Sequence, residues 1–400
     1  MNPADPSALN NLGSALRDVG DVDEAEACYR RVLSIKRDHP EANNNLGMLL
    51  SDRGRHSEAL TCYRKVLAVD PAHTGALTNS AVAVRRSGNT AEAIELWQQA
   101  ISRRPDCVEA HVYLADTLAD LGRVEEACRH ALAADALEVP PRSALRYALG
   151  IALARCGMRE SAIARLRQCV AGDPRDRYGA RLALSALNEA PMPQRASEEF
   201  IDRLYAIGAD RWDSAAGPFP YRGAALVADK VCGNDLDVLD AGCGTGLVGA
   251  LVRERSRRLV GIDLSAAMLE LARAKNVYDE LHKGDLVAFM LARPQSCDVV
   301  TCAATLIHFG DLGPAFVAAG SALRSGGSFV FTVFPNERDD AFSVADLDGL
   351  GQGGCFTHGR GYIARTAMAN GFEVETIENA VHEYKHGSPT MGLVAVLRKA

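Results

Sequence analysis

The chain has 400 residues, of which 48% are hydrophobic and 24% are charged, and its formal net charge is -7. This composition is ordinary for soluble globular proteins, and the length allows two or three domains that each bury a core. No stretch approaches the roughly 18 to 20 apolar residues of a membrane span. Residues 1–12 lack the basic flank and apolar centre of a secretory signal. We therefore expect a cytoplasmic protein without a membrane partner.

Charge distribution and cysteine content narrow the class further. Residues 1–190 hold 24 Lys and Arg against 25 Asp and Glu, and residues 191–400 hold 20 against 26, so the acidic excess lies in the C-terminal half. Nucleic acid is disfavoured as a partner because its phosphates require a basic face. The 11 cysteines form no C-x-x-C pair and no metal-ligand spacing. We expect reduced thiols and no metal site.

The N-terminal part repeats itself with a period of 34 residues. Glycines mark the repeat at intervals of 34 residues, with one of 35: Gly20, Gly54, Gly88, Gly122 and Gly157. An alanine follows each glycine five residues later. The glycine permits a tight turn between antiparallel helices, and the alanine lets these helices cross closely.

The stretch PEANNNLGMLLSDRGRHSEALTCYRKVLAVDP resembles the tetratricopeptide repeat, and the resemblance covers about residues 6–176. It implies an N-terminal all-α tetratricopeptide solenoid over residues 1–188, with about five repeats. We expect an apolar helix at residues 178–187 to cap the stack, as repeat arrays generally require.

Three successive repeats carry asparagine at one position of the first helix: Asn11, Asn45 and Asn79. A ladder of amides can pair with the backbone of an extended peptide. It resembles the asparagine ladder of the repeats in protein O-linked N-acetylglucosamine transferases. Solvation of a helix near a turn is the alternative interpretation, and Tyr113 and Ala148 interrupt the ladder. The hypothesis is a protein or peptide partner on the concave face, with a homo-oligomer left open.

Residues 189–218 are predicted to be a linker and a lead-in helix. The linker contains two prolines, and an amphipathic segment with Phe200, Ile201, Leu204 and Tyr205 on one face follows it. From residue 219 to residue 400, apolar strands alternate with helices. This pattern predicts an α/β domain with a mostly parallel sheet.

The first strand of this domain ends in a glycine-rich turn, DVLDAGCGTG. Gly242, Gly244 and Gly246 allow a sharp turn whose backbone can approach a ligand closely. Cys243 is interpreted as a small filler within backbone that faces the ligand. Leu247 stands where the dinucleotide motif G-x-G-x-x-G would have its last glycine.

Acidic residues stand at the ends of three successive strands: Asp240, Asp263 and Asp285. A carboxylate at the tip of the second strand can accept hydrogen bonds from both ribose hydroxyls, which is the role we assign to Asp263. For S-adenosylmethionine as the ligand, Asp285 is placed to accept a hydrogen bond from the adenine amino group. Asp240 is placed beside the methionine end of the same cofactor. Leu264 and Leu286 complete the predicted site. The pattern favours S-adenosylmethionine over a dinucleotide.

Residues 219–400 resemble the class I S-adenosylmethionine-dependent methyltransferases. The stretches CDVVTCAATLIHF and LRSGGSFVFTVF are similar to the fourth and fifth strands of that family, and GFEVETI and MGLVAVLRK to its final antiparallel pair. The resemblance implies a Rossmann-like fold with a mostly parallel seven-stranded sheet. PYRG, FGDL and FTHGRGYIARTAMANGF are also similar to a bacterial group of tetratricopeptide-fused methyltransferases. The segment AIGADRWDSAAGPFPYRG retains the tyrosine and arginine of that group's entry motif and matches its upstream part only loosely.

Two histidines are candidate general bases, because imidazole titrates near neutral pH and both lie beyond predicted strand ends. His308 follows the fourth strand, and His358 lies in the turn CFTHGRGY. Each has a packing role as its alternative. Arg360 and Tyr362 are candidates for binding an anionic acceptor, or else they pack the loop.

Tyr221 and Arg222 precede the helix that leads into the first strand, where the class I methyltransferase fold commonly covers its cofactor. Arg222 is a candidate partner of the cofactor carboxylate. We expect methyl transfer from S-adenosylmethionine to a protein, peptide or carrier-bound acceptor docked by the repeats. A small-molecule or glycan O-methyltransferase and a scaffold with a non-catalytic domain are the alternatives.

Overall fold

The chain forms two compact units, residues 1–172 and residues 173–400. The computed structural model describes residues 5–19, 21–137, 139–206, 221–344, 355–385 and 388–400. The division falls earlier than residue 188, the boundary that we predicted. The reason is that α11 (Ala180–Ala186), expected to cap the repeats, belongs to the second unit, where Leu182 lies in a buried cluster with Phe200 and Ile201.

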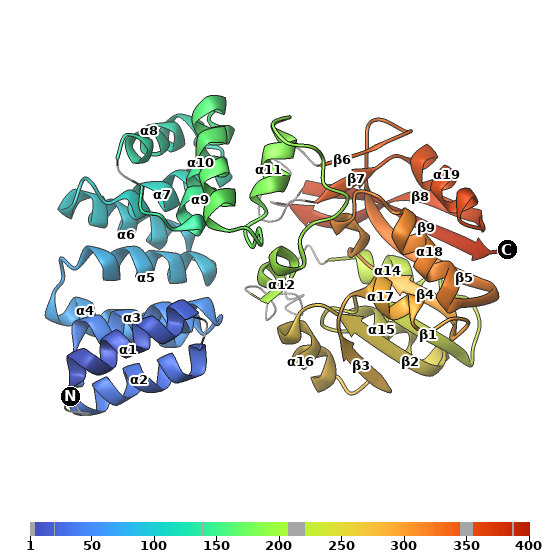
Figure 1. Cartoon of the computed structure of the whole chain (residues 1–400), viewed down its shortest axis with the longest axis horizontal. Helices are drawn as coiled ribbons and strands as arrows, with labels where there is room; N and C mark the ends of the chain where they lie inside the picture. Colours follow the sequence, from blue (N-terminus) through green and yellow to red (C-terminus); the bar gives the residue numbers. More distant parts are fainter. Residues whose placement is uncertain (1–4, 20, 138, 207–220, 345–354, 386–387) are drawn as a thin grey trace. The chain divides into compact units, whose positions relative to one another are not determined.

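The first unit is a stack of antiparallel helix hairpins (Figure 1). Its described helices are α1 (Pro6–Val19), α2 (Val22–Ile35), α3 (Pro40–Asp52), α4 (His56–Val69), α5 (Thr74–Arg86), α6 (Thr90–Arg103), α7 (Val108–Asp120), α8 (Val124–Asp135), α9 (Ser143–Arg155) and α10 (Arg159–Gly172). None of them, nor any other helix in the described residues, is long and apolar enough to cross a membrane.

The periodic glycines and alanines have the roles that the sequence predicts. Gly54 and Gly88 lie between the helices of their hairpins with φ of 78° and 98°, a left-handed conformation that glycine adopts without strain. The alanines five residues further on are completely buried. A second contact recurs in the hairpins: Tyr63 packs against Gly47 so closely that a Cβ at the glycine would overlap the ring.

Ion pairs connect successive repeats. Arg85 of α5 binds Asp116 at 2.7 Å and Asp120 at 2.5 Å, both on α7, and Arg155 of α9 binds Asp120 at 2.7 Å. These side chains are only 13 to 26% exposed. The first helices of three repeats are therefore joined by charges that water screens incompletely.

The second unit is built on a sheet in the order β3, β2, β1, β4, β5, β9, β8, with β9 antiparallel to both of its neighbours and the other pairs parallel. This is the predicted seven-stranded arrangement. Two short strands, β7 and β6, extend from the end of β5 and were not predicted. The strands are β1 (Leu236–Ala241), β2 (Ser256–Asp263), β3 (Glu280–Lys283), β4 (Cys297–Cys302), β5 (Leu323–Pro335), β6 (Phe342–Val344), β7 (Phe356–His358), β8 (Phe372–Lys385) and β9 (Ser388–Lys399).

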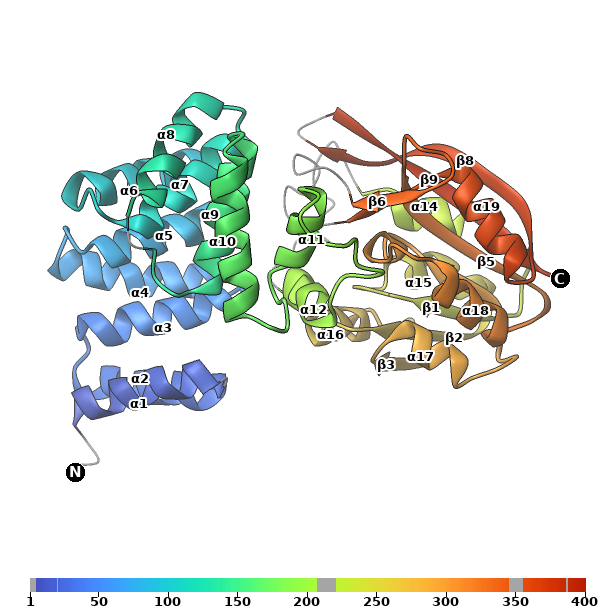
Figure 2. The same cartoon turned by 45° about the horizontal axis from the view of Figure 1, so that its top comes forward.

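Helices cover both faces of this sheet (Figure 2). Neighbouring strand residues point to opposite faces: Val238 joins the apolar cluster with α14 and α15, and Leu239 joins the cluster with α17, α18 and α19. Helix α12 also belongs to the second unit, and the apolar face predicted for it, with Phe200 and Ile201, packs into a buried cluster. The helices are α12 (Glu198–Ala206), α14 (Gly223–Ala228), α15 (Leu247–Val252), α16 (Ala266–Ala274), α17 (Leu286–Leu291), α18 (Gly313–Ala322) and α19 (Arg360–Ala369), with short 3₁₀ turns η1 (Arg253–Arg255) and η2 (Leu306–His308).

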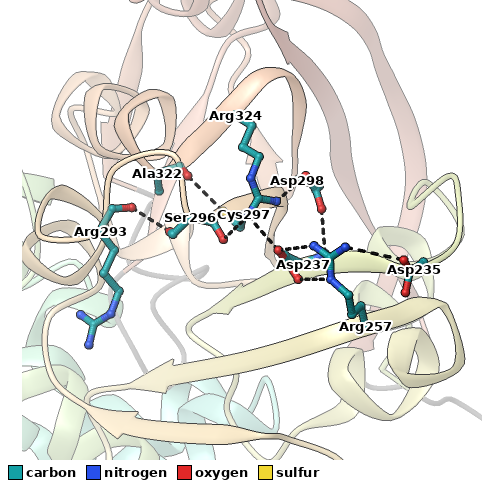
Figure 3. Close-up of polar contacts among 9 residues, drawn as sticks. All are labelled: Asp235, Asp237, Arg257, Arg293, Ser296, Cys297, Asp298, Ala322 and Arg324. Atoms are coloured by element: carbon teal, nitrogen blue, oxygen red, sulfur yellow. Dashed lines mark hydrogen bonds and ion pairs between the residues drawn. The ribbon is translucent and has the colours of Figure 1, made fainter.

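A charged network ties the amino-terminal ends of the parallel strands together (Figure 3). Asp237 of β1 accepts hydrogen bonds from Arg257 of β2 at 2.6 and 3.1 Å and from Arg324 of β5 at 2.8 Å. Arg324 also binds Asp298 of β4 at 2.6 Å. The hydrogen bond from Arg257 holds the pKa of the Asp237 carboxyl below its ordinary value. This end of the sheet is thus fixed by charges, which leaves the opposite end for a ligand.

Candidate functional site

A cavity of about 870 Å³, counting the space open to solvent, lies beyond the carboxyl ends of β1, β2, β3 and β4. Ligands of open α/β sheets bind at this edge. Its lining comes from residues 242–245, 247–248, 262–264, 268, 284–286, 303–305 and 308–309, together with residues 195, 201, 205, 221 and 224.

The turn after β1 forms the floor of the cavity. Gly242, Gly244 and Gly246 have φ of 77°, 54° and 86°, so all three adopt the left-handed conformation. The N–H of Gly242 donates to the carbonyl of Ile262 at 2.8 Å, which ties the turn to β2. Gly242 and Gly244 line the cavity, while Gly246 begins α15 and does not. The alternate glycines therefore shape the turn, and two of the three reach the ligand space.

Asp263 lies at the tip of β2 and lines the cavity, as predicted. Its carboxylate accepts the N–H of Gly244 and the N–H of Ser265, each at 2.8 Å. Burial raises the pKa of the Asp263 carboxyl, and these hydrogen bonds act in the opposite direction. A carboxylate oxygen has two acceptor positions, so both oxygens retain capacity for hydroxyl donors.

The residues present fit the adenosine part of S-adenosylmethionine. Gly244 lines the cavity, and the position that a Cβ would occupy there has no atom within 4 Å. Leu264 and Leu286 stand beside the strand tips and supply apolar walls for a planar base. Thus Asp263 would hold the ribose, and the two leucines would hold the base.

Asp240 does not reach the cavity, in contrast to its predicted place by the methionine end. The side chain is 1% exposed and lies beneath the turn, where it accepts hydrogen bonds from Tyr278 at 2.6 Å and Thr301 at 3.0 Å. Burial raises the pKa of Asp240 to about 6. The reason for the difference is that the side chain of Asp240 points toward Tyr278 and Thr301, away from the cavity. Asp240 therefore supports the turn from below.

Asp285 lines the cavity after β3, but both of its oxygens have partners. Oδ1 caps α17 by accepting the N–H of Ala288 at 2.8 Å, and Oδ2 forms an ion pair with Arg195 at 2.9 Å. The guanidinium of Arg195 also lies 4.9 Å from the centre of the Phe309 ring. The predicted adenine acceptor is thus present, with an arginine beside it that the sequence did not suggest.

His308 lines the cavity, and its Nε2 forms a hydrogen bond of 2.8 Å with the hydroxyl of Tyr205 from α12. The two rings meet edge to face with centroids 5.5 Å apart. Burial lowers the pKa of His308 to about 4, helped by the charge of Arg195. The imidazole is therefore neutral at pH 7 and able to accept a proton.

His358 is placed differently and does not line the cavity. It is completely buried in β7, and its Nε2 donates to the carbonyls of Phe309 and Gly310 at 2.8 and 3.2 Å. The only N–H of its neutral ring is used to hold the loop after η2, which is the packing role given as the alternative. His358 is a packing residue of this loop.

Arg360 and Tyr362 also bind protein groups rather than the cavity. Arg360 donates to the carbonyl of Ile377 in β8, and the Tyr362 hydroxyl accepts the N–H of Leu312 at 2.9 Å. Neither lines the cavity. Their predicted contact with an acceptor is not supported, since both fix α19 to its surroundings.

Of the two residues before α14, one lines the cavity and the other does not. Tyr221 lines the cavity, whereas Arg222 has an exposed side chain and contributes its backbone N–H to the carbonyl of His382 at 2.9 Å. The predicted pairing of Arg222 with a cofactor carboxylate is therefore not supported. Residues 207–220, which contain most of the loosely matching entry motif, lie outside the described residues.

Cys243 lines the cavity but is buried, and burial raises the pKa of its thiol well above the ordinary value. It remains protonated at neutral pH and acts as the filler that we predicted. In the described residues, no group of three or more His, Cys, Asp or Glu is arranged to hold a metal ion.

The asparagine ladder joins neighbouring repeats. Asn45 donates to the side-chain oxygen of Asn10 at 3.1 Å, and Asn79 donates to that of Asn44 at 3.1 Å. Asn11 is exposed on α1. The amides that we assigned to a peptide thus serve at least partly to align the first helices of successive repeats.

Sequence reasoning missed four residues of the site. Arg195 and Tyr205 enter the cavity from the segment before the sheet, Thr305 covers Gly242 and donates to its carbonyl at 3.2 Å, and Tyr278 holds Asp240. The amphipathic pattern placed Tyr205 on an apolar helix face, which was the available signal. The other three depend on contacts between distant segments.

Fold and site together define a class I methyltransferase domain preceded by a helical repeat region. A family described as methyltransferase domain matches residues 239–331, and two families described as tetratricopeptide repeat match residues 5–72 and 78–139. The chain therefore joins tetratricopeptide repeats to an S-adenosylmethionine-dependent methyltransferase domain, and it is an enzyme of that class.

Several characterised proteins are similar to the chain. Malonyl-[acyl-carrier protein] O-methyltransferase of Yersinia pestis is 29% identical over 195 residues, which cover 48% of this chain and 67% of that protein. Ubiquinone biosynthesis O-methyltransferase of Xanthomonas campestris pv. campestris (strain B100) is 28% identical over 225 residues, 52% of this chain and 84% of that protein. The structure of 1,6-didemethyltoxoflavin-N1-methyltransferase of Burkholderia thailandensis matches with a TM-score of 0.40 and 18% identity, covering 51% of this chain and 87% of that one.

Proposed function

We propose that this protein transfers a methyl group from S-adenosylmethionine to an oxygen atom of an acceptor presented on a protein or a protein carrier. The observation that carries the proposal is the union in one chain of a methyltransferase domain with a repeat array of five hairpins. Repeat arrays of this kind offer extended surfaces for protein partners, which a small free metabolite does not need.

The choice of oxygen draws on two relatives. Both proteins named above, which match about half of this chain, are O-methyltransferases by name, and one of them acts on a malonyl group held by an acyl carrier protein. A carrier-bound acceptor suits a chain that has a separate unit for a protein partner. We propose that three asparagines contact this partner: Asn11, which is exposed on α1, and Asn45 and Asn79 through their side-chain amides.

The cavity residues would hold the cofactor by its adenosine part, as described for Asp263, Leu264 and Leu286. When bound, S-adenosylmethionine supplies an electrophilic methyl group. The protein then has to exclude water and hold the acceptor oxygen in line with this group, because alignment provides most of the acceleration in such displacements. Tyr205, Tyr221 and His308 line the same cavity and are the polar candidates for positioning the acceptor.

His308 is the proposed base where the acceptor oxygen carries a proton. In the tautomer that carries its proton on Nδ1, His308 Nε2 accepts from the phenol of Tyr205, so a proton taken from the acceptor by the Tyr205 oxygen can be matched by transfer of the phenolic proton to His308 Nε2. The low pKa of His308, about 4, makes it a weak base that is already neutral above about pH 5, so its own titration adds no pH dependence to the rate near neutral pH.

The test compares acceptors that differ in whether a protein carries them. Full-length protein is incubated with methyl-labelled S-adenosylmethionine and malonyl-acyl carrier protein, malonyl-coenzyme A or a free catechol. We expect kcat/KM to be at least about tenfold higher for the carrier-bound acceptor, with Asn45→Ala raising its KM and sparing kcat.

Other outcomes would redirect the assignment. Equal or better transfer to the free catechol would contradict the proposal and favour a small-molecule O-methyltransferase. Transfer to none of the acceptors by protein that binds S-adenosylhomocysteine would favour a scaffold with a non-catalytic domain. Asp263→Ala serves as the control that separates enzyme-dependent labelling from background.

A further inference from the structure

The ion pair between Arg195 and Asp285 places a positive charge where the adenine amino group is expected. Oδ1 of Asp285 accepts the N–H of Ala288, whereas Oδ2 is buried, accepts no hydrogen bond and forms only an ion pair with the guanidinium at 2.9 Å. The arginine side chain thus lies against the one oxygen of Asp285 that still has its hydrogen-bond acceptor positions open.

The backbone around Arg195 is fixed. Residues 194–196, here called the strap, pair with the segment after η2: Ala196 donates to the carbonyl of His308 at 2.9 Å, and Gly310 donates to the carbonyl of Gln194 at 2.7 Å. Arg195 itself forms an antiparallel bridge with Phe309. Since both flanks of the strap are hydrogen-bonded, the arginine side chain can move while its backbone stays in place.

The guanidinium has a second carboxylate within reach. Nη2 of Arg195 lies 3.5 Å from Oε1 of Glu198, which is 55% exposed at the start of α12, while Asp285 is 19% exposed. The guanidinium lies 4.9 Å from the centre of the Phe309 ring, which offers an aromatic face to the cation. A rotation of the Arg195 side chain can thus release Asp285, the more buried partner, and keep Glu198, the more exposed one.

We propose that Arg195 determines the affinity of the cofactor site by competing with adenine for Asp285. In the described state the guanidinium of Arg195 pairs with Asp285 at 2.9 Å and with Glu198 at 3.5 Å; on cofactor binding its side chain leaves Asp285 and stays with Glu198, so that Asp285 Oδ2 receives the adenine amino group. This inference rests on the cofactor of the proposed function and is independent of the acceptor.

The experiment is calorimetric titration of full-length protein with S-adenosylhomocysteine, which has the adenine group of S-adenosylmethionine and no methyl group to transfer. Arg195→Gln keeps much of the side-chain length and removes the competing charge. We expect it to bind about two- to fivefold more tightly than the unchanged protein, the range that loss of a partly exposed ion pair provides. Glu198→Gln, which removes the outer partner, should weaken binding by about twofold and have no effect in the Arg195→Gln background.

Arg203→Ala is the matched control, because this arginine of α12 stacks on Tyr178 at 4.4 Å and does not line the cavity. It should leave the affinity unchanged. S-inosylhomocysteine, which has no amino group on the base, should bind less tightly, and Asp285→Asn should reduce this difference.

Unchanged or weaker binding by Arg195→Gln, in protein that still unfolds cooperatively, would overturn the competition and leave the proposed function intact. Absence of binding in the unchanged protein would instead contradict the cofactor assignment on which both rest. The two failures are therefore distinguishable in one series of titrations.

Discussion

The carboxylate of Asp263 accepts the backbone N–H of Gly244 at 2.8 Å, so the tip of β2 is bonded directly to the turn that follows β1. The bond fixes the carboxylate and the glycine backbone as one surface of the cavity. Because the N–H of Ser265 holds the other oxygen, Asp263 is oriented entirely by backbone donors. A preoriented carboxylate loses little conformational freedom when it binds a diol.

Two glycines of the turn should respond differently to the same change. Gly242→Ala adds a Cβ that overlaps the Thr305 side chain and also strains a backbone with φ of 77°, whereas Gly244→Ala adds only the strain, with no neighbour within 4 Å. We expect Gly244→Ala to cost about 1 to 2 kcal/mol of stability and Gly242→Ala to cost distinctly more. Thermal unfolding measures both.

The change at Gly244 should also weaken cofactor binding. Gly244 lines the cavity, so its new methyl group should reduce the affinity for S-adenosylhomocysteine by at least about tenfold in protein that remains folded. Equal losses of stability in the two variants would contradict the described packing of Thr305.

His358 should make stability depend on pH. Burial lowers its pKa to about 4, below the 6.5 of the unfolded chain, so the unfolded state binds the proton first and stability from this group falls as pH drops below about 6.5. Between pH 7 and pH 5 the loss is about 2 kcal/mol, at roughly 1.4 kcal/mol for each pH unit.

His358→Gln keeps an N–H donor for the carbonyls of Phe309 and Gly310 and cannot titrate. We expect the stability difference between the unchanged protein and this variant to shift by about 2 kcal/mol in favour of the variant from pH 7 to pH 5. Guanidinium chloride unfolding at the two pH values measures the shift. A difference that stays constant with pH would show that the histidine is not buried in its neutral form.

Arg85 should matter for the repeat array alone. Arg85→Ala leaves Asp116 without its 2.7 Å partner and with Arg155 only at 3.9 Å, whereas Asp120 retains Arg155 at 2.7 Å. We expect a loss of about 1 to 3 kcal/mol of local stability, seen as faster hydrogen exchange in α5 and α7. Arg64→Ala, an exposed arginine of α4, is the control and should change exchange little. Loss of protection throughout residues 221–400 would contradict the separation into two units.

Local features were predictable from the sequence because their causes are local. A turn between helices requires glycine, and the 34-residue spacing of Gly54 and Gly88 repeats that requirement once per hairpin. Asp263 was predictable for a similar reason, since carboxyl ends of neighbouring parallel strands meet at one edge of the sheet. The fold and the base of the cofactor site follow from such rules.

The remaining site residues depend on contacts that no local pattern contains. Arg195 and Asp285 are 90 positions apart and meet because the strap pairs with the segment after η2. His358 is buried because its strand, β7, pairs with β5 on one side and β6 on the other. Strands of three residues such as β6 and β7 leave no readable alternation in the sequence. Asp240 looked like a ligand because it precedes the glycines, but its side chain points toward Tyr278.

The measurement that tests the account most directly is calorimetric titration of full-length protein and its Asp263→Ala variant with S-adenosylhomocysteine, with a nicotinamide dinucleotide as the control ligand. We predict saturable binding at about micromolar concentration for the unchanged protein, at least about a hundredfold loss in the variant, and no binding of the dinucleotide. Equal affinity in the folded variant would contradict the assignment of Asp263 and of the cavity around it.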